Sequence, residues 1–208
     1  MSQLVGCAWT GGVVLAADRR VTVGTDEGEQ TRSVRKLYPL GHWAAAATAG
    51  AAVGIGLTRR IARAFHGRAA PFLDEIEPYI LKVFCREYEA FVQQGARWFA
   101  AHPEAHQRSY LLLGGKDSAG AFRIAFYASE AHDCPHAPLP VGNVVTAPRR
   151  LGLEARLAQE LAGEPAPGAV EELVAVALRR IAQRDEAVGG PFDLAVLDSH
   201  GLRFETLE

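Results

Sequence analysis

The sequence predicts an α+β fold in which antiparallel strands and helices pack as a sandwich, and two observations carry this prediction. The first is the order of the segments, because four strand-like runs are followed by two helices, two strands, two helices and two strands. Such blocks disfavour a parallel sheet, in which strands and helices alternate. The second is size. The 208 residues, 49% of them hydrophobic and 22% charged, can bury one core, so we expect a single domain over residues 1–208.

The first block of strands is expected to form two hairpins. Apolar, β-favouring runs at residues 3–9 and 13–18 are separated by a Thr-Gly-Gly segment, which predicts a tight turn. The polar stretch at 24–31 is expected to be a loop, and a proline and a glycine supply the turn of the second hairpin. The strands of this second hairpin are expected at residues 34–38 and 42–48.

Helical periodicity follows these strands. Apolar residues recur every three or four positions over residues 51–67 and 74–101, and Pro103 marks the end of the second helix. These two helices should form one outer layer, with the aromatic residues of the second in the core or against another subunit. The later strands are expected at residues 110–114, 122–129, 193–198 and 202–206, and the later helices at 151–162 and 170–181.

Charge and composition argue against several classes of function. A net charge of −2 gives no electrostatic reason to expect a nucleic acid or an anionic membrane as partner. The first residues lack the basic and apolar regions of a signal peptide, and no apolar run is long enough to span a bilayer. We therefore expect a cytoplasmic protein.

The cysteines suggest neither a disulfide framework nor a zinc site. Cys7, Cys85 and Cys134 are odd in number, widely spaced and outside any CxxC pattern, which fits a reducing compartment. The cluster HDCPH at residues 132–136 has metal-ligand residue types, but it is crowded around a proline and lacks a distant second ligand pair. A surface loop is the expectation there, and no metal or other cofactor is predicted.

Four short motifs occur along the chain. Residues 12–22 are GVVLAADRRVT, Lys36 lies in VRKLY, residues 48–50 are TAG ahead of a helix, and residues 184–190 are RDEAVGG ahead of a strand. In this order they resemble segments of proteasome β-type subunits and their bacterial relatives, the Anbu- and HslV-like N-terminal-nucleophile (Ntn) hydrolases. The resemblance spans nearly the whole chain. It implies a four-layer αββα sandwich of two antiparallel sheets between helix layers.

The resemblance also implies a catalytic site. Removal of Met1 would make Ser2 the N-terminal nucleophile, because the interval from Ser2 to Asp18 equals the family's interval between nucleophile and aspartate. Asp18 and Lys36 would tune the proton affinity of the site. A backbone N–H would stabilise the oxyanion, and a second aspartate would support the nucleophile. The implied catalytic set is Ser2, Asp18, Lys36, Gly50 and Asp185.

The residue types of this set suit acyl transfer. A hydroxyl is a weak nucleophile and needs a base, and an N-terminal α-amine with a pKa of about 7.7–8.0 can serve when the hydroxyl belongs to the first residue. Burial lowers the pKa of an ammonium group and a nearby carboxylate raises it, so a Lys–Asp pair can adjust the proton affinity. A glycine lets its backbone N–H approach an oxyanion without obstruction by a side chain.

By the same resemblance, the substrate would add as a strand beside Thr22 and Gly50, and the first specificity pocket would be apolar or small. Its expected lining is Val21, Val34, Thr48 and Ala52. An apolar substrate residue is therefore expected at this pocket. The peptide or unfolded-protein substrate would be cleaved within a homo-oligomeric ring or spiral of identical copies, and an ATP-dependent unfoldase is a candidate partner.

The sequence also departs from the family pattern. Serine replaces the usual threonine nucleophile, and two supporting serines are absent, because the corresponding stretches are Thr146-Ala147-Pro148 and Val188-Gly189-Gly190. Two alternatives to an Ntn peptidase therefore stay open. One is a non-catalytic proteasome-like assembly protein, and the other is an Ntn amidohydrolase or acyl-transfer enzyme that acts on small amides.

Overall fold

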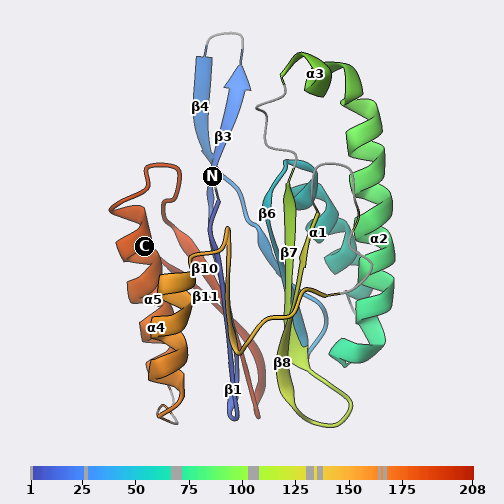
Figure 1. Ribbon diagram of the computed structural model, residues 1–208. Helices are drawn as coiled ribbons and strands as arrows, with labels where there is room; N and C mark the ends of the chain where they lie inside the picture. The colour runs from blue at the N-terminus through green and yellow to red at the C-terminus, as the bar shows by residue number, and fades with distance from the viewer. Residues whose placement is uncertain are drawn as a thin grey trace.

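The protein is a mixed α+β chain with antiparallel sheets and five helices over its described residues (Figure 1). The computed structural model describes residues 2–25, 28–66, 72–102, 108–129, 134, 138–163, 165 and 168–208. Every pair of named strands in this part of the chain is antiparallel. The prediction against a parallel βαβ fold is confirmed.

One sheet has five strands in the order β11-β10-β2-β1-β9. Its strands are β1 (Leu4–Trp9), β2 (Gly12–Asp18), β9 (Val144–Ala147), β10 (Phe192–Asp198) and β11 (Gly201–Leu207). Four of them match the predicted runs to within two residues. The fifth, β9, was not expected, because its four residues are too few to show a period. It pairs with β1 and places Leu4 opposite Ala147.

The second sheet has four strands in the order β5-β6-β7-β8. They are β5 (Leu37–Pro39), β6 (Ala44–Gly50), β7 (Ser109–Lys116) and β8 (Phe122–Ala128). The expected strand at 34–38 is wrong in its start, because Val34 donates its N–H to the carbonyl of Arg19 and the ladder with β6 begins only at Leu37. Lys36 therefore lies immediately before a strand.

The expected loop at 24–31 is also wrong. Strands β3 (Arg20–Thr25) and β4 (Gly28–Ser33) form a separate two-stranded hairpin that extends beyond both larger sheets (Figure 1). All of β4 is exposed, so its residues carry no apolar alternation and its sequence resembles that of a loop.

The helices are α1 (Val53–Phe65), α2 (Leu73–Gln94), α3 (Ala96–Ala101), α4 (Leu151–Leu161) and α5 (Ala169–Ala182). The single helix expected at 74–101 is wrong, because it breaks at Gly95, where α2 ends and α3 turns away. The apolar period continues through this break and conceals it. None of the helices among the described residues has the length and apolar character to span a bilayer.

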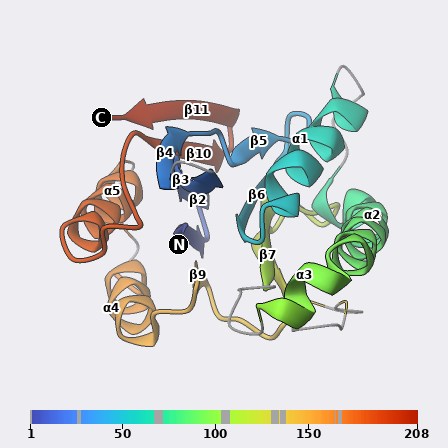
Figure 2. The same ribbon diagram turned by 90° about the horizontal axis from the view of Figure 1, so that it is seen from above.

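Three apolar clusters position these elements. The first joins α1 and α2 to the four-stranded sheet, as expected for the first two helices. The second takes its residues from both large sheets, and the third joins α4 and α5 to the five-stranded sheet. Seen from above, α1 and α2 lie on one side of the strands and α4 and α5 on the other (Figure 2). Each large sheet thus packs against a pair of helices, which holds its strands in place.

The cysteines differ from expectation. Cys85 of α2 forms a disulfide with Cys134, so the prediction that no cysteines pair is wrong. Their separation of 49 positions along the chain gave no spacing signal, and only the packing of α2 brings the two together. Cys7 is free and buried, and burial raises the pKa of its thiol to about 12. No metal-binding cluster occurs among the described residues, and His132, Asp133 and His136 lie outside them.

Candidate functional site

The candidate site forms where β1 begins and β2 ends. The antiparallel register places Leu4 opposite Ala17, so the residues before Leu4 lie beside Asp18. The N–H of Gln3 donates to Asp18 Oδ1 at 2.8 Å, and the N–H of Asp18 donates back to the carbonyl of Gln3 at 3.2 Å. These two hydrogen bonds hold Ser2 just before the start of β1, next to the aspartate.

Lys36 connects these residues. Its Nζ lies 2.6 Å from Ser2 Oγ, 2.9 Å from Asp18 Oδ1 and 2.6 Å from the carbonyl oxygen of Arg20. Lys36 is 1% exposed and Asp18 is fully buried. An ammonium group has three donors, and each has an acceptor here. The structure therefore brings together Ser2, Asp18 and Lys36, which the sequence predicted as neighbours from three separate segments.

Burial dominates the electrostatics of the pair. Loss of water lowers the pKa of Lys36 below its ordinary value, although the neighbouring Asp18 carboxylate opposes this shift. Loss of water likewise raises the pKa of Asp18, against the effect of Lys36 and of the N–H of Gln3. A lysine with a lowered pKa loses its proton more readily and can then accept one. Such a group lies in contact with the hydroxyl of Ser2.

Gly50 ends β6 on the opposite side of the same pocket. Its φ is +87°, and a Cβ here would lie 2.2 Å from the carbonyl oxygen of Arg108. Glycine is thus required both by the backbone conformation and by the close approach of the segment that leads into β7. The resulting bend carries the chain from β6 into α1 and leaves Gly50 exposed in the pocket that Ser2 also lines.

A pocket of about 550 Å³ contains this constellation. Ser2, Lys36 and Gly50 line it, as do four of the residues predicted to contact the substrate or its backbone: Val21, Thr22, Thr48 and Ala52. The hydroxyl of Thr48 hydrogen-bonds with that of Thr58 inside α1 at 2.7 Å. Thr48 therefore has its polar group engaged away from any ligand.

Two predicted residues lie elsewhere. Val34 is not among the described residues that line the pocket, and its N–H donates a hydrogen bond to the carbonyl oxygen of Arg19. Asp185 accepts a hydrogen bond from Arg150 at 2.6 Å, and Arg150 donates another to the Gln3 side chain at 2.6 Å. Asp185 thus reaches the residue after Ser2 through an arginine and makes no described hydrogen bond to Ser2 itself.

The positions of the two missing serines have other uses. Thr146 donates its hydroxyl to Glu154 at 2.7 Å and accepts the N–H of Arg150, so it organises the start of α4. Val188 is buried in the apolar cluster under α5. The sequence did not reveal the role of Arg150. This residue precedes α4, and only the fold brings it close to Asp185 in RDEAVGG.

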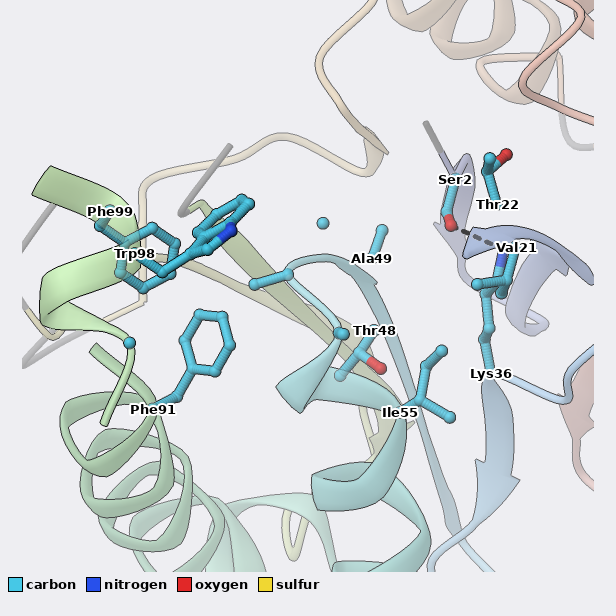
Figure 3. Close-up of a pocket in the computed structure, with 14 residues that line it drawn as sticks. Ser2, Val21, Thr22, Lys36, Thr48, Ala49, Ile55, Phe91, Trp98 and Phe99 are labelled. Atoms are coloured by element: carbon cyan, nitrogen blue, oxygen red, sulfur yellow. Dashed lines mark hydrogen bonds between the residues drawn. The ribbon is translucent and has the colours of Figure 1, made fainter. Parts of the chain in front are cut away.

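The sequence also missed the far wall of the pocket. Phe91 of α2 and Trp98 and Phe99 of α3 line it, opposite Ser2 and Lys36, with Thr48, Ala49 and Ile55 between the two ends (Figure 3). These aromatic residues were expected in the core or at a subunit contact. The break at Gly95 places them at the pocket, and no short-range pattern indicates that break.

The chain matches no model of a known protein family, and no curated protein matches it. The geometry of the site is therefore the basis for assigning a function. Among the described residues, the pocket offers the buried amine of Lys36, the hydroxyls of Ser2, Thr22 and Thr48, and mostly apolar side chains, which suits a reaction on a neutral carbonyl.

Proposed function

We propose that the protein is an Ntn-type peptidase that uses Ser2 as its nucleophile. The observation that carries this proposal is the 2.6 Å contact between Ser2 Oγ and the buried amine of Lys36, inside a pocket large enough for a substrate side chain. A hydroxyl next to an amine with a lowered pKa meets the basic requirement for nucleophilic catalysis.

In the proposed reaction, the neutral amine of Lys36 accepts the Ser2 Oγ proton as Oγ attacks the substrate carbonyl carbon. The negative charge that develops on the carbonyl oxygen is stabilised by the N–H of Gly50. The C–N bond then breaks, and the leaving amine takes the proton from Lys36. Water hydrolyses the acyl-serine ester and restores the hydroxyl. Asp18 holds Lys36 in place throughout.

The N-terminal amine has a further role in the proposal. Removal of Met1 frees the α-amine of Ser2, which would share the proton with Lys36. Met1 lies outside the described residues, so an intact-mass measurement is the direct check. Retention of Met1 would leave Ser2 without a free α-amine and would contradict an Ntn mechanism.

The proposed fold is the four-layer αββα sandwich of this class of hydrolase. The three apolar clusters, one between the sheets and one beneath each pair of helices, support it. We also propose a ring or spiral of identical copies, acting on peptides or unfolded protein, with an ATP-dependent unfoldase as candidate partner. Light scattering coupled to size-exclusion chromatography tests the assembly, and a monomer at micromolar concentration would contradict it.

A peptidyl β-lactone tests the function. Attack by Ser2 Oγ opens the lactone ring, so the chain gains the full mass of the reagent and no group leaves. We expect one adduct, mapped to Ser2 by peptide mass spectrometry, and none in a Ser2→Ala variant. Absence of an adduct on Ser2 in the native protein would overturn the proposal.

One observation favours a non-catalytic assembly protein as the second candidate. Asp185 is engaged by Arg150 and makes no described hydrogen bond to Ser2, so one supporting contact of the expected site is absent. An unreactive Ser2 in a well-formed ring would favour this candidate. An amidohydrolase that acts on small amides would label at Ser2 but turn over small amides faster than peptides.

A further inference from the structure

The pocket beside Ser2 ends in an aromatic wall, defined as Phe91, Trp98 and Phe99 (Figure 3). The rings pack on one another: Phe91 and Phe99 are 5.4 Å apart and Trp98 and Phe99 are 5.3 Å apart, both pairs edge to face. Trp98 is nevertheless 54% exposed, among the most exposed large hydrophobic residues of the described chain. A large aromatic surface open to water at a pocket usually indicates a binding surface.

The backbone is arranged to form this wall. At Gly95 a Cβ would lie 2.5 Å from the ring of Phe99 and 3.2 Å from the carbonyl oxygen of Phe91. Glycine therefore allows the ring of Phe99 to fold back onto the end of α2. The same turn places Trp98 over the mouth of the pocket, where its ring stacks on His102.

The wall and the nucleophile belong to one continuous pocket. Between them lie the methyl of Ala49 and the side chain of Ile55, while the hydroxyl of Thr48 is engaged by Thr58. Among the described lining residues, Lys36 is the only charged one, and it lies at the Ser2 end. A group that enters from Ser2 thus meets apolar atoms first and aromatic faces last.

We propose that this pocket selects substrates with an aromatic side chain on the acyl part that Ser2 attacks. This inference rests on the proposed function. A small aliphatic group at the acyl position would fill only the part near Thr48 and Ala49, whereas an aromatic ring reaches the faces of Phe91 and Trp98. Aromatic pairs prefer edge-to-face or offset contacts, and the wall presents both edges and faces.

The test compares two peptidyl β-lactones that differ only in the side chain, benzyl or methyl. The second-order rate of Ser2 acylation, followed by intact mass, should favour the benzyl reagent by at least tenfold. In Trp98→Ala and Phe91→Ala the preference should fall about tenfold, because a well-packed ring contact is of that order. Tyr79→Ala is the matched control, since Tyr79 is an exposed aromatic residue of α2 outside the pocket. An unchanged preference in both wall variants would overturn the inference.

A binding measurement separates this inference from the proposed function. In a Ser2→Ala variant, N-acetylphenylalaninamide should shift the indole N–H signal of Trp98 in a ¹H–¹⁵N spectrum, and N-acetylalaninamide should not. Trp98→Phe assigns the signal. If Ser2 does not react with the β-lactone but the Trp98 signal shifts, the proposed peptidase function is wrong and the aromatic binding site is supported. The absence of a shift with the aromatic amide would overturn the aromatic binding site. A shift that depends on protein concentration alone would also overturn it, because the aromatic wall would then be a contact between copies of the chain.

Discussion

The two ends of the pocket are built in different ways. At the Ser2 end, the polar groups of Asp18 and Lys36 are buried, and Asp18 Oδ1 and Lys36 Nζ have hydrogen-bond partners within 2.9 Å. At the other end, the aromatic wall is held by ring packing, and Trp98 is exposed to solvent. The first end depends on exact placement of charges, whereas the second depends on the shape of a helix break. Changes at the two ends should therefore have separable effects.

The largest effect should follow Lys36→Met, which removes the amine but keeps most of the side-chain volume. We expect acylation of Ser2 by a peptidyl β-lactone to slow by about 10²–10⁴-fold, the usual contribution of a positioned base. The preference for aromatic over small reagents should persist in the residual rate, because the aromatic wall is untouched. Intact-mass kinetics with both reagents would measure rate and preference together.

The Lys36→Met variant should also be less stable, because Asp18 would remain buried without its partner. Loss of one member of a buried pair costs about 3–5 kcal/mol. The double variant Asp18→Asn/Lys36→Met removes both charges and keeps an oxygen to accept the N–H of Gln3. It should recover most of the stability in urea unfolding but none of the activity. Recovery of activity would show that Lys36 has only a structural role.

The pH dependence of acylation should come next in size. Burial lowers the pKa of Lys36 from its ordinary value of 10.5, so the neutral amine appears at a lower pH than in an exposed lysine. The rate should therefore rise with pH and level off at an apparent pKa below 10.5, about tenfold per unit on the rising limb. If the rising part of the pH–rate profile has the same apparent pKa in Lys36→Met as in the native protein, the base is a group other than Lys36.

The same shift has a consequence for stability. The folded chain binds fewer protons at Lys36 than the unfolded chain between the lowered pKa and 10.5, so the contribution of this group to stability rises with pH in that window. Asp18 acts in the opposite sense. Because the pKa of Asp18 is raised, its carboxyl binds more protons in the folded chain than in the unfolded chain between pH 3.8 and the folded pKa. The contribution of Asp18 to stability therefore falls as the pH rises through this window.

The sequence predicted these two ends unequally. Asp18 and the strand before it follow from a short local motif, and Lys36 and Gly50 follow from motifs next to strand ends, so their meeting required only the correct strand order. The aromatic wall depends on Gly95, where the apolar period continues although the helix does not. Arg150 and the Cys85–Cys134 disulfide likewise depend on contacts between distant segments, which no local pattern encodes.

Arg150 should have a smaller effect, because it acts on Ser2 through Gln3. Its guanidinium bridges Gln3 and Asp185, and loss of this bridge would loosen the residue that follows the nucleophile. Arg150→Ala should lower kcat by up to about 10²-fold, the scale of a misplacement near 1 Å, with little change in KM. Arg150→Lys should recover only part of this, since lysine lacks the fork that reaches both partners. An unchanged kcat would exclude Arg150 as a positioning residue.

The smallest effect should come from Gly95→Ala, which changes only the aromatic end. The backbone of Gly95 has φ of −84°, which alanine adopts freely, and a residue other than glycine favours helical conformation by roughly 0.5–1 kcal/mol. The added Cβ would nevertheless lie 2.5 Å from the ring of Phe99 and 3.2 Å from the carbonyl oxygen of Phe91, so the ring of Phe99 would have to shift within the aromatic wall. We expect the protein to unfold at a similar urea concentration and Ser2 to react with a methyl β-lactone at the native rate. Its preference for the benzyl reagent should fall a few-fold. A loss of rate with both reagents would mean that the two ends are coupled through α3.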